Sequence, residues 1–157
     1  MPEKFLILGA NSFYGSNFVR LLRDRGAYVR EISKPGFNIL DPGGWLNWTE
    51  EGETIVNFIS QSSVVESWDN PGLWLRVNAE ATTEVFDRLR KSKVGKYVHV
   101  STPEVYGSTP HWVEEDYPYN PTTPYAVSRA AGDMMLKSYF KAYGFPMLIT
   151  RTANIYG

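Results

Sequence analysis

The chain has 157 residues, enough for one domain with a substantial core, and its sixteen Lys and Arg nearly balance seventeen Asp and Glu. Such a balance gives no electrostatic support to a role in coating nucleic acid. The absence of cysteine excludes thiolate catalysis, disulfides and Cys-based metal sites, and two histidines are too few for a His-rich zinc site. No metal site is therefore expected.

Five apolar runs predict β-strands. Most of them are too continuously apolar for a sheet with one face in water, which favours a buried parallel sheet. The runs are KFLILGA (4–10), AYVREIS (27–33), ETIVNFIS (53–60), KYVHVST (96–102) and PMLITRTAN (146–154). The apolar stretch of the first run has only four residues, too few for a signal peptide or a membrane span, so a cytoplasmic protein is expected.

Four helices are predicted between the strands. The first ends at Gly26 in a left-handed cap, the second starts with an acidic cap and a proline, and the last ends at Gly144. The predicted spans are 16–25, 41–48, 71–93 and 124–143, and the third has apolar residues every four positions. Strands that alternate with helices predict right-handed crossovers and an α/β fold with a doubly wound parallel sheet.

An irregular segment and the tryptophans remain outside this pattern. The segment 104–124 holds four prolines, and a loop of that length in a compact domain favours a functional role. For the tryptophans, packing against the domain is favoured over stacking on a base or a sugar. They are Trp45, Trp48, Trp68, Trp74 and Trp112.

A glycine turn follows the first strand directly and precedes the first helix. Gly9, Ser12 and Gly15 occupy the three positions of a Gly-x-x-Gly-x-x-Gly turn. In such a turn, backbone N–H groups and the helix N-terminus face a pyrophosphate. Ser12 replaces the middle glycine, which we expect to weaken binding rather than abolish it. A purely structural turn is the alternative.

The end of the second strand carries Ser33 and Lys34, where dinucleotide-binding sheets often place an acid for the adenosine ribose. A hydroxyl followed by a cation tolerates a 2′-phosphate, which favours NADP slightly over NAD. The alternative is that Lys34 is only a solvated loop charge.

Tyr125 and Arg129 open the last predicted helix and share one of its faces, because they are four residues apart. At roughly 5 Å and an effective dielectric near 20, their attraction is about 3 kcal/mol and favours the phenolate, as a general base requires. The pair alone is a weak signal, since about one Tyr-x-x-x-Lys/Arg is expected by chance in such a chain.

Five motifs occur in one order along the chain: NFISQSSVVESWDNP, VNAEATTEVFDRLRK, YVHVSTPEVYG, NPTTPYAVSRAAGD and ITRTANIYG. With the glycine turn, they resemble the extended short-chain dehydrogenase/reductases, the NAD(P)-dependent nucleotide-sugar epimerases and dehydratases. The similarity is greatest to sugar-nucleotide 4,6-dehydratases of the dTDP-glucose type, whereas residues 33–45 resemble dTDP-4-dehydrorhamnose reductases. The resemblance implies a Rossmann fold over residues 1–157 that binds NAD(P) and ends before the family's substrate-binding region.

The resemblance also implies roles for individual residues. Thr102 would hydrogen-bond the sugar's 4-hydroxyl, and Tyr125 would exchange its proton during hydride transfer at C4. The implied catalytic residues are Thr102, Glu104, Tyr125 and Arg129. The implied cofactor-binding residues are Gly9, Asn11, Ser12, Phe13, Tyr14, Gly15, Ser33, Lys34, Asn38, Ile39, Phe58, Ile59, Ser60, Asn78, Tyr125 and Arg129.

Two positions depart from the family pattern. Arg129 stands where the family has lysine, and its planar guanidinium keeps the charge but lacks the compact contact of an ammonium. Pro103 stands where the dehydratases have an acid and can move no proton, so epimerisation or redox at C4 becomes more credible than water elimination. Glu104 either removes a proton or only orders its loop.

Three functions stay open: an epimerase or dehydratase, a non-catalytic NAD(P)-binding scaffold, and a keto-sugar-nucleotide reductase. Residues 1–157 alone are expected to bind cofactor weakly and to be inactive. The implied partners are a nucleotide-sugar and a second copy, which would pair through helices 71–93 and 124–143, although intramolecular packing is equally able to use these apolar residues. They are Leu75, Val85, Leu136, Phe140 and Tyr143.

Overall fold

The computed structural model describes residues 2–41 and 49–156, and its centre is a five-stranded sheet in the order β2-β1-β3-β4-β5. All neighbouring strands run parallel. The strands are β1 (Lys4–Leu8), β2 (Tyr28–Ile32), β3 (Thr54–Asn57), β4 (Lys96–Ser101) and β5 (Met147–Arg151). Each lies within its predicted run, and the predicted doubly wound parallel sheet is confirmed.

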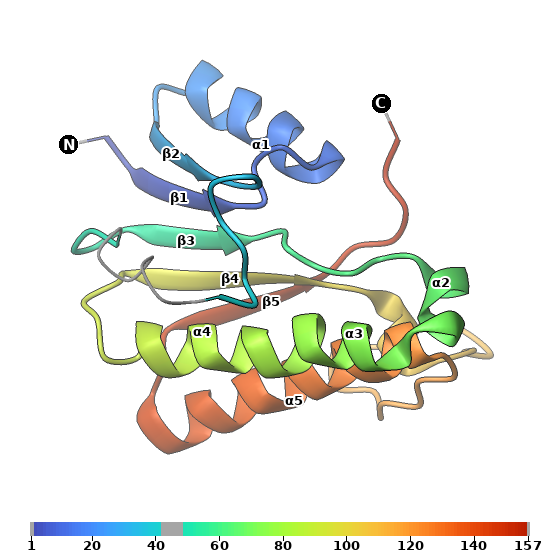
Figure 1. The fold of residues 1–157 in the computed structure, drawn as a ribbon. Coiled ribbons are helices and arrows are strands. Elements are labelled where there is room, and N and C mark those ends of the chain that lie inside the picture. The colour runs from blue at the N-terminus through green and yellow to red at the C-terminus, as the bar shows by residue number, and fades with distance from the viewer. Residues whose placement is uncertain (1, 42–48, 157) are drawn as a thin grey trace.

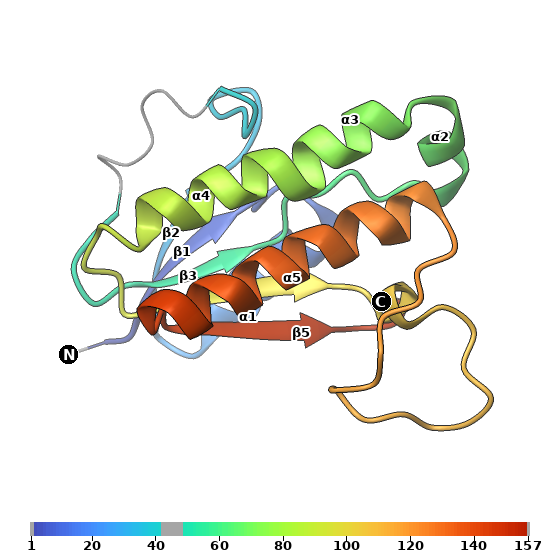
Figure 2. The ribbon, with the colours of Figure 1, turned by 90° about the horizontal axis from the view of Figure 1, so that it is seen from below.

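The long helices divide between the two faces of the sheet, with α1 on one face and α3, α4 and α5 on the other (Figures 1 and 2). The helical elements are α1 (Phe13–Asp24), α2 (Val64–Asp69), α3 (Pro71–Leu75), a π-helical segment (Arg76–Ala81), α4 (Thr82–Leu89), a 3₁₀ turn (Pro103–Tyr106) and α5 (Pro124–Tyr143). None of the described helices is long and apolar enough to cross a membrane.

The ends of the helices follow capping chemistry. The α1 helix begins three residues before its predicted start, because the Ser12 side chain accepts a hydrogen bond from Gly15 N and caps it. Its end is as predicted, with Gly26 in the left-handed region at φ 77°. The α5 helix has its predicted bounds, capped by Thr123 and closed by Gly144 at φ 64°.

The helix predicted over 71–93 is a continuous helical run from α3 through the π-helical segment to α4, and it ends at Leu89 rather than at residue 93. Four of its five periodic apolar residues are at most 5% exposed, so the predicted apolar face is the buried one. They are Val77, Ala81, Val85 and Leu89. The α2 helix was not predicted. The short helix predicted over 41–48 lies almost entirely outside the described residues.

The core lies in two layers because strand side chains alternate between the faces. Leu6 and Leu8 of β1 pack toward α4 and α5, whereas Ile7 packs toward α1. Of the tryptophans that the structure describes, Trp74 is 3% exposed and fits the packing prediction. That prediction is wrong for Trp68 and Trp112, which are 64% and 99% exposed.

Gly132 allows α5 to approach the π-helical segment closely, since a Cβ added there would lie 2.6 Å from Asn78 O. We predict that Gly132→Ala lowers the free energy of unfolding by about 1–3 kcal/mol, as forced overpacking does. Gly72→Ala is the matched control, because Gly72 lies in α3 with open space around it. Helix propensity should make that variant stable to within about 1 kcal/mol of the parent, or better. Equal denaturant midpoints for the two variants would contradict this packing argument.

Candidate active site

Two adjoining cavities open at the carboxyl ends of the strands, and they share Ser12, Phe58 and Ser60 in their walls. Their volumes are about 470 Å³ on the side of β2 and about 570 Å³ on the side of β4 and α5. The chain leaves β1 for β2 on one side and returns to β3 on the other, so the groove lies where the strand order reverses. Open parallel sheets bind ligands at this position.

The glycine turn lies in the middle of this groove. Gly9 has φ 79°, and Gly15 sits so close to the turn that an added Cβ would lie 2.3 Å from Gly9 O. Ser12 Oγ accepts from Gly15 N at 3.0 Å, so this serine occupies one N–H of the helix N-terminus while its own proton remains available for donation. The turn therefore keeps a tight backbone but presents a hydroxyl in place of one backbone N–H.

The first cavity gathers most of the residues that the resemblance assigned to a cofactor. Asn11 Nδ2 donates to Lys34 O at 3.2 Å and thereby links the glycine turn to the end of β2. The predicted residues in its wall are Gly9, Asn11, Ser12, Ser33, Lys34, Asn38, Ile39, Phe58, Ile59 and Ser60. Phe58 also packs against Phe18, at 5.6 Å between ring centroids, so this bulky residue lies over α1.

Asn78 lies outside both cavity walls and fixes their geometry instead. Its Oδ1 accepts from Gln61 N at 2.8 Å, and its Nδ2 donates to Gln61 O at 2.9 Å and to Ser128 Oγ at 2.9 Å. One buried amide thus ties the π-helical segment both to the loop after β3 and to α5.

The second cavity brings together the predicted catalytic side chains. Thr102, Tyr125 and Arg129 are buried, and Glu104 in the same wall is exposed. Thr102 Oγ1 accepts from Glu104 N at 3.3 Å and caps the 3₁₀ turn. Predicted residues from the first helical turn, Phe13 and Tyr14, also lie in this wall. These side chains come from the first turn of α1, from the residues directly after β4 and from the first two turns of α5.

Arg129 is 2% exposed, and its hydrogen-bonding capacity is largely unused. Nη2 donates to Val100 O, while Nε and Nη1 have no hydrogen-bond partner. Burial lowers the pKa of this guanidinium, and the nearby Tyr125 and Asp133 act in the opposite direction. Both unpartnered nitrogens are themselves buried, although the residue lines the cavity.

A buried charged cluster continues below Arg129 along α5. Asp133 Oδ2 accepts from Arg151 Nε at 3.1 Å and from the Tyr119 hydroxyl at 3.0 Å. His99 lies beside Asp133, with 3.7 Å between Nε2 and Oδ1. The sequence analysis missed this cluster, although the spacing of Tyr125, Arg129 and Asp133 on one helix face was a usable signal.

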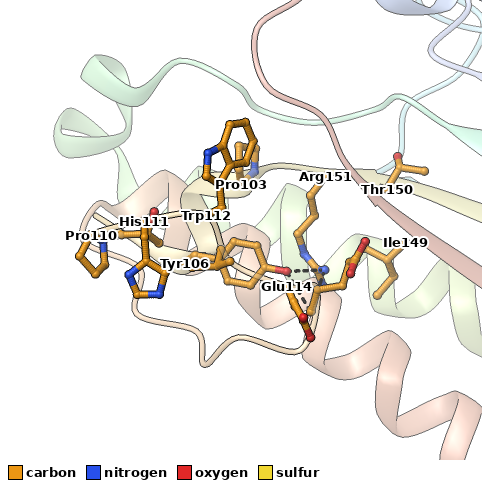
Figure 3. A pocket seen from close by; sticks show the side chains of 12 residues that line it. Pro103, Tyr106, Pro110, His111, Trp112, Glu114, Ile149, Thr150 and Arg151 are labelled. Carbon is orange, nitrogen blue, oxygen red and sulfur yellow. Dashed lines mark hydrogen bonds between the residues drawn. The ribbon is translucent and has the colours of Figure 1, made fainter.

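A third cavity of about 640 Å³ is lined in part by Pro103 and Tyr106 of the 3₁₀ turn (Figure 3). Most of the remaining wall comes from β5 and from the irregular segment that was expected to be functional, which includes the exposed Trp112. Arg151 Nη1 donates to the Tyr106 hydroxyl at 2.8 Å and holds this segment to the strand. Pro103 lies in this cavity rather than in the one with Tyr125.

Further residues of the second cavity were not singled out from the sequence. Their common signal is position, because several directly follow or end a strand. They are Ser62, Val64, Val100, Ser101, Thr152 and Asn154. Within residues 2–41 and 49–156, no group of three or more metal-ligating side chains is present.

A doubly wound parallel sheet with a glycine turn at its switch point and a groove across its strand ends defines a dinucleotide-binding fold. Residues 5–157 match the model of the NAD dependent epimerase/dehydratase family, and the chain belongs to this family. The resemblance seen in the motifs is thereby confirmed.

Relatives and solved structures agree with this assignment. The dTDP-glucose 4,6-dehydratase of Streptomyces antibioticus is 38% identical over 68% of this chain and 32% of its own length. That of Streptomyces venezuelae, solved with NAD bound, has a TM-score of 0.87 at 28% identity, over 98% of this chain and 56% of its own. The UDP-glucose 4-epimerase of Thermus thermophilus, solved in complex with NAD, has a TM-score of 0.88 at 27% identity. This match covers 98% of this chain and 56% of the epimerase chain. The chain thus spans about half the length of these structures.

The buried His99 leads us to expect that folding stability depends on pH. The imidazole is fully buried, and burial, with Arg129 and Arg151 nearby, holds its pKa well below the usual value. The unfolded chain takes up this proton near pH 6.5 and the folded chain does not, so stability is complete above that pH and falls below it. We predict a loss of up to about 1.4 kcal/mol per pH unit between about pH 6.5 and about pH 5.5 from this group.

The measurement is urea unfolding across that interval. His99→Gln should flatten the slope of unfolding free energy against pH, while His111→Gln, at an exposed position, should keep the parental slope. Identical slopes for all three proteins would show that His99 does not carry the effect.

Proposed function

We propose that this chain forms the NAD(P)-binding part of a nucleotide-sugar epimerase or dehydratase that acts by hydride transfer at sugar C4. The observation that carries the proposal is the placement of Thr102, Tyr125 and Arg129 in a cavity continuous with the glycine-turn groove. Relatives named as dTDP-glucose 4,6-dehydratases and neighbours solved with NAD support it.

The groove suits a nicotinamide dinucleotide. Gly9 and Gly15 let the turn pack tightly against the start of α1, and Gly9 lies in the wall of the first cavity, where a pyrophosphate would lie beside the helix N-terminus. Asn38 and Ile39 border the same cavity, where an adenine would lie. Asn78 would act by fixing the loop at Gln61. Arg129, in the wall of the second cavity, would lie near the ribose hydroxyls. When bound, the nicotinamide supplies the site that accepts and returns a hydride.

The chain's own residues would handle the proton. As the hydride leaves C4, the 4-hydroxyl becomes a ketone and its proton must go to a base. Tyr125, buried in the first turn of α5, would take this proton on its phenolate oxygen and return it when the ketone is reduced. Thr102 would hydrogen-bond the same oxygen, and the charge of Arg129 would stabilise the phenolate.

The choice between reactions depends on position 103. Pro103 has no ionisable side chain and lies in the neighbouring cavity, so the acid needed for water elimination would have to come from elsewhere. This favours epimerisation or reduction of a keto-sugar nucleotide over dehydration. The hydrogen bond of Arg129 to Val100 O ties the guanidinium to the protein itself, and this observation favours the alternative of a non-catalytic NAD(P)-binding scaffold.

We also propose a homodimer through α3, α4 and α5. Leu75, Phe140 and Tyr143 are 44%, 53% and 59% exposed and are available for such an interface. The prediction is wrong for Val85 and Leu136, which are fully buried in the core of their own chain. A monomeric mass at high concentration would contradict the dimer.

The first test concerns the cofactor. We predict that the protein binds NADPH at least as tightly as NADH, and that Lys34→Glu weakens NADPH binding about tenfold, because a carboxylate repels the 2′-phosphate. Lys96→Glu is the control, since Lys96 is exposed at the opposite end of the sheet. Titration by fluorescence gives both dissociation constants. A tenfold preference of the parent for NADH would overturn this prediction.

The second test concerns Tyr125 in the protein at its full natural length. Tyr125→Phe should lower kcat by about 10²–10⁴-fold, as loss of a general acid or base does, with little change in cofactor affinity. Turnover that survives this change within about threefold would exclude the phenol as the proton-handling group. If the parent is inactive and Arg129→Lys restores turnover, the arginine is the cause of the inactivity, and the parent is then a non-catalytic NAD(P)-binding scaffold.

A further inference from the structure

The buried charges on the α5 side of the sheet are not balanced. Among the described residues there, Asp133 is fully buried and pairs with Arg151 at 3.1 Å, while Arg129 is 2% exposed. His99 is neutral, because burial holds its pKa well below the usual value. The cluster therefore contains two guanidinium groups and one carboxylate, and it carries an excess of one positive charge.

The excess charge lies in the wall of the second cavity. Arg129 lines this cavity together with Tyr125, and its Nε and Nη1 have no hydrogen-bond partner. Glu53, another buried carboxylate, pairs with Arg30 near the amino ends of the strands and cannot compensate it. A guanidinium holds its proton at any physiological pH, so this charge is permanent.

One carboxylate does face the same cavity. Glu104 lies in the wall but is exposed, and its charge is therefore screened by water. A buried charge acts through a lower effective dielectric and has the larger influence on a ligand in the cavity. The field in this part of the groove is therefore positive.

We infer that the cavity lined by Tyr125 and Arg129 discriminates by charge and binds the reduced, uncharged nicotinamide ring more tightly than the oxidised, cationic ring. This inference rests on the proposed function, in which a nicotinamide nucleotide occupies the groove. The two forms share the adenosine, the pyrophosphate and both riboses, so the glycine turn and the first cavity contribute equally to both. The difference in affinity isolates the electrostatic effect of the second cavity.

A consequence for the reaction follows from this preference. Tighter binding of the reduced form makes the bound cofactor a stronger oxidant by the same factor, so hydride transfer from sugar C4 to the nicotinamide is favoured over its return. The substrate class that suits this state is a sugar nucleotide with a free 4-hydroxyl: C4 is oxidised to the ketone, one equivalent of oxidised cofactor is reduced, and the hydroxyl proton goes to Tyr125.

The experiment measures dissociation constants for NADP⁺ and NADPH by calorimetry near neutral pH. We expect the parent to bind NADPH about tenfold more tightly than NADP⁺, which is the effect of about one charge–charge interaction of moderate strength. The quantity compared among variants is the ratio of the dissociation constant for NADP⁺ to that for NADPH. Arg129→Met, which keeps the volume and removes the charge, should reduce the ratio to about twofold or less. Arg129→Lys should keep a ratio close to that of the parent.

Glu104→Gln provides an independent check that does not touch the buried cluster. Removing an exposed negative charge from the same wall should raise the preference for NADPH. A parental ratio at or below unity, an undiminished ratio in folded Arg129→Met, or a lower ratio in Glu104→Gln would each overturn the inference. Failure of the parent to bind either form would overturn the proposed function instead, so the two failures are distinguishable.

Discussion

The close packing of α5 on the helical run from α3 to α4 is the constraint on which the site depends. Gly132 permits this approach, and the amide of Asn78 uses it by bonding both Gln61 and Ser128. Ser128 directly precedes Arg129, so the buried amide sets how far the α5 wall stands from the loop after β3. The shape of the cavity that holds the predicted catalytic side chains is therefore set by an interhelical contact whose residues, Gly132, Asn78 and Ser128, do not line that cavity.

Much of the fold could be predicted because its signals are local. Continuous apolar runs identified each of the five described strands, and the proline and glycine at the ends of α5 marked its bounds. The start of α1 was misplaced because Ser12 was interpreted as part of an open turn, whereas its side chain caps the helix. The environments of Trp68 and Trp112 could not be predicted, since side-chain exposure depends on contacts between distant segments.

The motifs predicted which residues lie together in the candidate site, but the sequence did not predict the contacts that surround them. The resemblance assigned Thr102, Tyr125 and Arg129 to one site, and they line one cavity. The buried partners Asp133, Arg151 and His99 were missed because they meet only when β4, β5 and α5 assemble. The assignment of Val85 and Leu136 to an interface failed because an apolar helical residue looks the same whether it faces its own sheet or a second chain.

The π-helical segment explains a regularity in the sequence itself. An α-helix advances about 100° per residue, so a four-residue step overshoots a full circle by about 40° and a stripe at that interval winds around the cylinder. Leu73, Val77, Ala81, Val85 and Leu89 nevertheless all pack into one core, because the wider π turn restores the angular phase midway. The number of residues in the π-helical segment thus sets which faces of α3 and α4 point to the core. Loss of a single residue from Arg76–Ala81 would rotate α3 relative to α4 about the helix axis.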